Sequence, residues 1–147
     1  MTALQQGGHE AEAIRIPFAV AEPERLVEEM LVARSIRVRN VDRAIALRFP
    51  AYLVPHPNKV IWLVDPFRHA YDAGSASRSR NDDRSRRIGR AVRGADLVAF
   101  AEAKRLFATT PVAAQRLQRV SGAGAAVLPA PEENSSDWTA TVEQLLA

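Results

Sequence analysis

The chain has 147 residues, of which 47% are hydrophobic and 25% are charged, with a net charge of +3 and no cysteine. This length and balance fit one folded domain, and they exclude a disordered chain, a disulfide framework and a thiolate metal site. No apolar run reaches the roughly 20 residues that span a membrane, and the polar N-terminus is unlike a signal peptide, so we expect a cytoplasmic protein.

The first third of the chain predicts two helices and two strands. Residues 2–6 form the end of a helix, and residues 13–17 alternate apolar and polar side chains as a short strand does. A second helix begins at residues 23–24 with acidic side chains in its first turn, where they favour the helix dipole. Residues 42–47 predict a second strand.

The middle of the chain holds the clearest strand. Residues 48–57 form a loop with three prolines, and residues 59–64 follow as a third strand. Because all but its first residue are apolar, we expect this strand to be buried on both faces of a sheet. A long helix should then start near Asn81 or Asp82 and run to about Lys104.

Strands and helices continue to alternate up to the C-terminus. Residues 106–109 and 125–128 predict two more strands. Between them, Thr110 caps a helix that has Pro111 at its first position, and a final helix follows a linker over residues 132–136. The pattern predicts an α/β fold, a three-layer Rossmann-like domain with a mainly parallel sheet, but it leaves the strand order open.

A polar segment directly follows the third strand, the position at which open parallel sheets bind ligands. It contains Asp65, Arg68, His69, Tyr71 and Asp72. Arginine can bind a phosphate through two hydrogen bonds, and a carboxylate or an imidazole can accept a proton from a hydroxyl group. The alternative is a structural salt bridge between Arg68 and Asp72, which are one helical turn apart.

Residues 49–72, FPAYLVPHPNKVIWLVDPFRHAYD, resemble the family 4 glycosyltransferases of the GT-B fold, in which a segment like FPSYLVxHPNKVVWLLHQHRxAYD lines the sugar-transfer cleft. The segments GHEAEAIRIPF, GRAVRGADLVAFAEAKRLFATTPVAAQRLQR and VLPAP are similar to further parts of the same N-terminal half, so the resemblance covers roughly residues 8–131. It implies an acceptor-side domain and the transfer of a hexose from a nucleotide sugar to an acceptor hydroxyl, with no metal or other cofactor.

The chain departs from this family in three places. The family's first strand and glycine-rich loop have no counterpart ahead of the first predicted helix, and its nucleotide-sugar domain has none after Pro131. We therefore expect residues 1–131 to form a truncated acceptor-side domain. Residues 132–147 should form a linker and a C-terminal helix, similar to the last helix of such enzymes, that packs back on the domain. Asp65 also replaces the histidine of the family's LLHQHR pattern, and we expect the isolated chain not to be an active transferase.

The polar segment and the resemblance together give the candidate site residues. Asp65 and Arg68 are the candidate catalytic residues, and the candidate substrate-binding residues are Phe49, Tyr52, His56, His69, Tyr71, Asp72, Thr109 and Thr110. Aromatic rings stack on sugars, but Phe49 and Tyr52 have an equal alternative, which is to anchor the proline-rich loop against the core. Thr110 has a full role as a helix cap without any ligand.

Two features bear on larger partners. Residues 78–93 hold seven arginines without interleaved aromatic residues, so we expect no specific nucleic-acid binding. They form either a solvated helix face or a contact for phosphate or anionic lipid headgroups, which would make any membrane contact peripheral. With three histidines and no cysteine, no metal site is expected.

The absent first strand favours association with another chain, because it leaves a sheet edge exposed. The alternative to an acceptor-binding domain is therefore an interaction module, either a homo-oligomer or a subunit of a split glycosyltransferase whose partner supplies the donor domain. A gene remnant without function is the remaining alternative.

Overall fold

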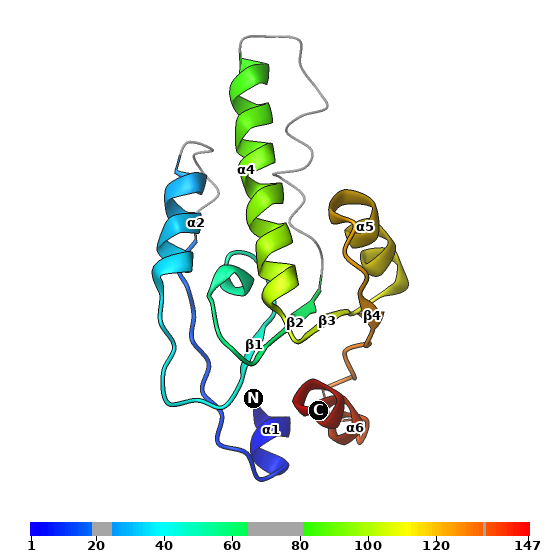
Figure 1. Ribbon diagram of the computed structural model, residues 1–147. Helices are drawn as coiled ribbons and strands as arrows, with labels where there is room; N and C mark the ends of the chain where they lie inside the picture. Colours follow the sequence, from blue (N-terminus) through cyan, green and yellow to red (C-terminus); the bar gives the residue numbers. More distant parts are fainter. Residues whose placement is uncertain (19–24, 65–80, 134) are drawn as a thin grey trace.

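A four-stranded parallel sheet forms the centre of the protein (Figure 1). The computed structural model describes residues 1–18, 25–64, 81–133 and 135–147. The strands lie side by side in chain order: β1 (Ala44–Ala46), β2 (Lys59–Leu63), β3 (Arg105–Ala108) and β4 (Ala126–Val127). All three pairings are parallel. The predicted α/β fold is therefore confirmed, and the strand order that the sequence left open is sequential.

β2 is the most deeply buried strand, as its unbroken apolar run predicts. Successive side chains of a strand point to opposite faces of the sheet. Ile61 and Leu63 accordingly pack on one side of the sheet, and Val60 and Trp62 pack on the other. Because both sides are covered, β2 joins two separate apolar clusters.

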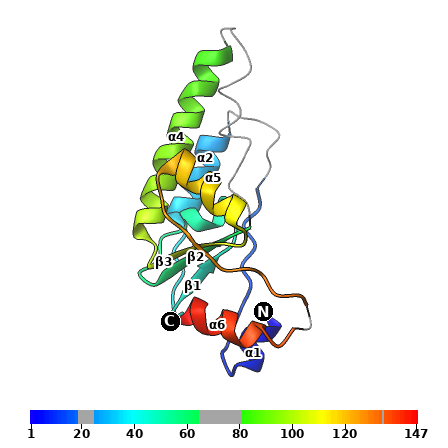
Figure 2. The same cartoon turned by 90° about the vertical axis from the view of Figure 1, so that its right-hand side faces the viewer.

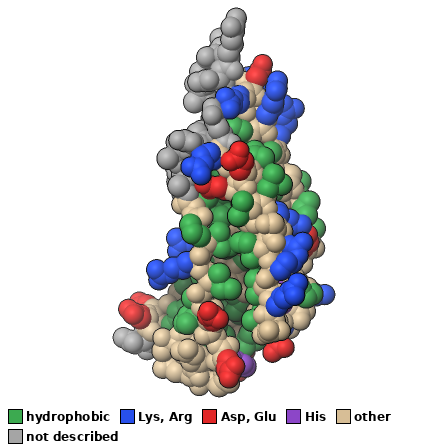
Figure 3. Space-filling model, turned by 90° about the vertical axis from the view of Figure 1, so that its left-hand side faces the viewer, with side chains coloured by type: hydrophobic (Ala, Val, Ile, Leu, Met, Phe, Trp, Pro, Cys, Tyr) green, Lys and Arg blue, Asp and Glu red, His purple; other side chains and the backbone are tan. Residues whose placement is uncertain are grey.

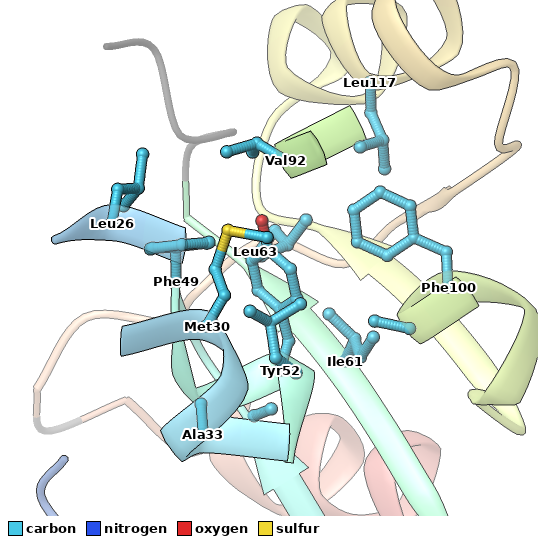
Figure 4. Close-up of a cluster of buried hydrophobic side chains, with 13 residues drawn as sticks. Leu26, Met30, Ala33, Phe49, Tyr52, Ile61, Leu63, Val92, Phe100 and Leu117 are labelled. Carbon is cyan, nitrogen blue, oxygen red and sulfur yellow. The ribbon is translucent and has the colours of Figure 1, made fainter. Parts of the chain in front are cut away.

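The larger cluster lies on the face that carries most of the helices. This face is covered by α2 (Leu26–Ser35), η1 (Ala51–Leu53), α4 (Asn81–Glu102) and α5 (Pro111–Ser121). The buried side chains of the cluster come from all four elements and from the sheet (Figure 4): Leu26, Met30, Ala33, Ala46, Phe49, Tyr52, Leu53, Ile61, Leu63, Val92, Ala99, Phe100 and Leu117. This is the main core of the domain.

A smaller cluster covers the opposite face of the sheet. Here α6 (Trp138–Leu146) packs Leu145 and Trp138 against the sheet, and α1 (Thr2–Gln6) lies against α6 (Figure 2). The Trp62 and Trp138 rings meet edge to face, with centroids 6.1 Å apart. The helix–sheet–helix order gives the three layers that the sequence predicts.

Two sequence-based expectations are corrected by the structure. Residues 13–17 do not form a strand, and Ile14 is exposed. Alternating side chains favour a strand only where a neighbouring strand offers hydrogen bonds and a surface to pack on, and no described strand lies beside this segment. β4 is also shorter than residues 125–128, since only Ala126–Val127 pair with β3.

Candidate functional site at the carboxyl ends of the strands

The carboxyl ends of β2 and β3 are joined by hydrogen bonds at one edge of the sheet. The backbone N–H of Thr109 donates to the carbonyl oxygen of Leu63 at 2.9 Å. The Thr109 hydroxyl donates to the carbonyl oxygen of Val64 at 3.1 Å. Val64 immediately precedes Asp65, so this hydrogen bond from Thr109 fixes the start of the predicted polar segment.

Thr110 begins α5 at the same edge of the sheet. Its backbone is extended, and its hydroxyl accepts a hydrogen bond from the N–H of Ala113 at 3.1 Å. Pro111 occupies the first helical position, where its lack of an N–H group costs no helix hydrogen bond. The helix stops at Gly122, whose φ of 70° is a left-handed conformation that favours glycine. The predicted cap is confirmed, and a ligand role for Thr110 stays a prediction.

Five predicted site residues lie outside the described residues. They are Asp65, Arg68, His69, Tyr71 and Asp72. Their roles in catalysis and substrate binding therefore stay predictions. What the structure supplies is the place from which their segment starts, at the end of β2 beside Thr109.

Phe49 and Tyr52 lie in the main core (Figure 4). Only 6% of Phe49 and 2% of Tyr52 are exposed. The Phe49 ring meets the rings of Phe18 and Tyr52 edge to face, with centroids 5.0 and 5.8 Å away, and Tyr52 also contacts Phe100 at 5.3 Å. In this arrangement neither ring offers a face to a sugar, and the position of both rings fits the loop-anchoring alternative.

His56 is buried and braces the loop between β1 and β2. The backbone N–H of Asn58 donates to its Nδ1 at 3.1 Å, and its Nε2 lies 3.3 Å from the carbonyl oxygen of Val41. A nitrogen that accepts carries no proton, so this geometry assigns the hydrogen of the neutral ring to Nε2, which donates to Val41. Both ring nitrogens have a structural partner, and a substrate role for His56 stays a prediction.

An ionic network between the buried Lys59 and the partly exposed Arg34 and Glu102, which the sequence did not reveal, also holds this loop. Lys59 is only 1% exposed, and its Nζ donates to the carbonyl oxygen of Tyr52 at 3.0 Å and to Glu102 at 3.1 Å. Arg34 donates two hydrogen bonds to Glu102, at 2.7 and 2.8 Å, and one to the carbonyl oxygen of Leu53. The network therefore ties α2, η1, β2 and α4 together.

The charges of this network shift its pKa values in the directions that the contacts dictate. The hydrogen bonds from Arg34 are the main reason that the pKa of Glu102 falls to about 2. Burial lowers the pKa of Lys59, against the hydrogen bond and the attraction of Glu102. Only the position of Lys59 at the start of a buried strand was visible in the sequence, because its partners lie far along the chain.

Tyr52 makes a second buried polar contact that the sequence did not reveal. Its hydroxyl donates to Oδ1 of Asp96 at 2.7 Å. Asp96 is a residue of α4 and is only 1% exposed. A buried carboxylate needs such donors, since it has lost its water shell. These contacts hold the loop between β1 and β2 against the core.

Five arginines of the cluster lie on α4, the first half of which projects beyond the sheet (Figure 1), and Arg78 and Arg80 lie outside the described residues. Arg84, Arg86, Arg87 and Arg90 are exposed, and Arg86 forms a surface pair with Asp83 at 3.6 Å. Such a pair contributes little to stability. Binding of phosphate or anionic lipid by this helix stays a prediction.

The side of the molecule that carries α2 and β1 is apolar. Leu31 and Val32 on α2 are 65% and 59% exposed, and Val41 and Leu47 on either side of β1 are exposed as well. Figure 3 shows this side, where hydrophobic side chains form a band with charged groups along its borders. In the described parts of the chain, no strand pairs with the outer edge of β1.

The described residues form neither a metal-ligand cluster nor a membrane-spanning helix. Within the described ranges, His, Asp and Glu side chains do not gather in threes as metal ligands. Among the described helices, none combines the length and the apolar character needed to cross a membrane. No protein-family model matches the chain, and it has no match among the curated proteins or the solved structures.

Proposed function

We propose that the chain is an acceptor-side sugar-binding domain of the kind found in family 4 glycosyltransferases, and that it does not transfer a sugar on its own. The observation that carries the proposal is the contact of Thr109 with Val64, at 3.1 Å. It holds the ends of two neighbouring parallel strands together at the point where the polar segment begins, which is where open α/β sheets bind ligands.

In this proposal the polar segment after β2 provides the chemistry. Arg68 binds an anionic group of the acceptor through its guanidinium, and Asp65 accepts the proton of the acceptor hydroxyl. The donor is a nucleotide sugar, which a separate donor-binding unit has to present. His69, Tyr71 and Asp72 would contact the acceptor, and no metal or other cofactor takes part.

The position of α6 supports the same proposal. The resemblance implies a final helix that packs back on the acceptor-side domain. In the structure, Leu145 and Trp138 of α6 pack on Val60, Trp62 and Phe107 of the sheet. Arg43, just before β1, donates a hydrogen bond to the carbonyl oxygen of Leu145 at 2.9 Å.

Calorimetric titration of the purified chain with acceptor sugars and nucleotide sugars tests the proposal. We expect binding of an acceptor sugar, with no binding of nucleotide sugars and no transfer. Arg68→Ala should abolish acceptor binding, whereas Arg87→Ala, which removes an exposed arginine of α4, should not change it. Sugar transfer by the isolated chain, or equal effects of the two variants, would contradict the proposal.

The second candidate function is an interaction module, and the edge of β1 favours it. An unpaired strand edge presents backbone N–H and C=O groups to another chain. Leu31 and Val32 of α2 add exposed apolar area, and Figure 3 shows an apolar band on the side of the molecule that carries α2 and β1. Measurement of the molecular mass in solution tests this candidate. A chain that is monomeric at every concentration and binds no other protein would exclude it.

A further inference from the structure

We infer that the outer face of α4 binds an anionic lipid surface, with the helix lying along the membrane. This face is defined by five exposed residues, which are Arg87, Arg90, Gly94, Leu97 and Ala101. They follow one another at intervals of three or four residues, so they share one side of the helix. The inference concerns a part of the molecule that the proposed function does not use, and it does not depend on sugar binding.

The helix α4 is longer than the sheet on which it packs. Its 22 residues span about 33 Å, whereas the five residues of β2, the longest described strand, span about 17 Å. The first half of α4 therefore projects beyond the sheet (Figure 1). Arg87 and Arg90 are exposed on or near this projecting part, so a flat surface can reach both.

The positive charge of the chain is concentrated on α4. Residues 84–101 contain five arginines and one aspartate, a net charge of +4, and the whole chain has a net charge of +3. The rest of the chain is therefore close to neutral. The one acid in this stretch, Asp96, is only 1% exposed and accepts the hydrogen bond of the Tyr52 hydroxyl. It lies on the buried side of the helix and leaves the outer face positive.

The two arginines of the outer face have no acidic partner among the described residues. Arg90 donates to the carbonyl oxygen of Arg86, one helical turn earlier, at 3.4 Å. Asp83 is close to Arg86 and not to either of these two arginines. Positive charge near the start of a helix also opposes the helix dipole, so helix stability does not account for the cluster. The charge of Arg87 and Arg90 is available to an anionic partner.

The second half of the face favours a membrane over other anionic partners. Leu97 and the adjacent Val98 are each about half exposed. On a helix that lies in a membrane interface, such side chains enter the boundary between headgroups and acyl chains, while guanidinium groups bind lipid phosphates. A polynucleotide would leave both apolar side chains in water. The one aromatic ring of residues 84–101, that of Phe100, is buried and cannot stack on a base.

Sedimentation of the full chain with lipid vesicles tests the inference first. We expect binding to vesicles that contain phosphatidylglycerol and none to vesicles of phosphatidylcholine alone, and added salt should weaken the binding. Arg87→Glu combined with Arg90→Glu should weaken it at least about 30-fold, which corresponds to about 1 kcal/mol for each arginine near an anionic surface. Arg37→Glu combined with Arg39→Glu changes the net charge equally, at exposed positions after α2, and should bind like the unchanged chain.

A second pair of variants tests the apolar half of the face. Leu97→Ser should weaken vesicle binding about fivefold, because it removes an apolar side chain that leaves water at the membrane. Leu31→Ser makes the same change at an exposed leucine of α2 and should leave vesicle binding unchanged. Circular dichroism checks that each variant keeps its fold, and acceptor titration reports separately on the sugar-binding proposal.

Four results would overturn the inference. The first is a chain that stays in solution with anionic vesicles, and the second is an equal loss of binding in the two double arginine variants, which would indicate an effect of net charge alone. The third is equal behaviour of the two serine variants. The fourth is binding to a soluble polyanion, polyuridylate or polyglutamate, without binding to vesicles, which would assign the face to a nucleic acid or an acidic protein.

Discussion

The loop between β1 and β2 and the segment that follows β3 are held in place in different ways. The loop is enclosed by aromatic rings, by the hydrogen bonds of His56 and by the ionic network of Lys59 and Glu102. The segment after β3 is held by the hydroxyls of Thr109 and Thr110 at the surface of the sheet. Many contacts brace the loop, whereas few contacts position the strand ends.

This difference separates residues that serve stability from residues that can serve binding. A side chain whose contacts are all internal can change ligand binding only by altering the fold. A side chain at the end of a strand can alter binding while the core stays intact. Substitutions in the loop should therefore cost much stability, and substitutions at the strand ends should cost little.

The largest effect is expected for Tyr52→Ala, at about 4 kcal/mol of unfolding free energy. The change removes a buried ring and a donor to the enclosed Asp96. Tyr52→Phe keeps the ring and should cost only about 1–2 kcal/mol. Urea denaturation measures both. A cost below about 1 kcal/mol for Tyr52→Ala would mean that the ring is not a core residue.

Glu102→Ala should cost about 3 kcal/mol, because it leaves the ammonium of Lys59 buried without its carboxylate. Arg34 is partly exposed, so water replaces its partner at smaller cost. The double variant Lys59→Met and Glu102→Ala should be more stable than Glu102→Ala alone, since the buried charge is removed as well. If the double variant is less stable, the charge of Lys59 is not the source of the cost.

The same carboxylate predicts a dependence of stability on acid. The pKa of Glu102 is lowered from 4.5 to about 2 in the folded protein, so its contribution is complete above pH 4.5 and is lost as the pH falls towards 2. Glu102→Gln removes this titration. We expect the urea midpoint of the unchanged chain to fall more steeply over that range than the midpoint of Glu102→Gln, and parallel curves would contradict the assignment.

Much of the fold follows from the sequence, because its main signals are local. The apolar run of β2 and the cap at Thr110 each depend on a few neighbouring residues, and each is found where the sequence predicts it. The absent strand at residues 13–17 shows the limit. Alternation is a local signal, but a strand also needs a neighbouring strand, which the sequence does not place.

The site is less predictable because its residue types serve two purposes. An aromatic ring that could stack on a sugar packs equally well on another ring, as Phe49 does on Phe18 and Tyr52. The choice depends on contacts between distant segments. The partnership of Lys59 with Glu102, or of Tyr52 with Asp96, likewise joins residues more than 40 positions apart. No spacing rule reveals such pairs.

At the strand ends, Thr110→Ala should cost about 1 kcal/mol, the usual loss when a helix cap is removed. Thr110→Ser keeps a capping hydroxyl and should restore most of that stability. Thermal and urea unfolding measure both variants. If Thr110→Ala leaves the free energy of unfolding unchanged, the hydrogen bond to Ala113 does not stabilise α5.

The smallest loss of stability, about 0.5 kcal/mol, is expected for Thr109→Val, which keeps the shape of the side chain and removes one surface hydrogen bond to Val64. If the strand ends position the acceptor site, the same change should weaken acceptor binding about tenfold, or about 1.4 kcal/mol, which exceeds its effect on stability. Ser121→Ala removes a comparable hydroxyl contact at the far end of α5, where the hydroxyl donates to Leu117, and should leave binding unchanged. A loss of affinity no larger than the loss of stability would place Thr109 with the structural residues of the loop, and the contrast between the two regions would disappear.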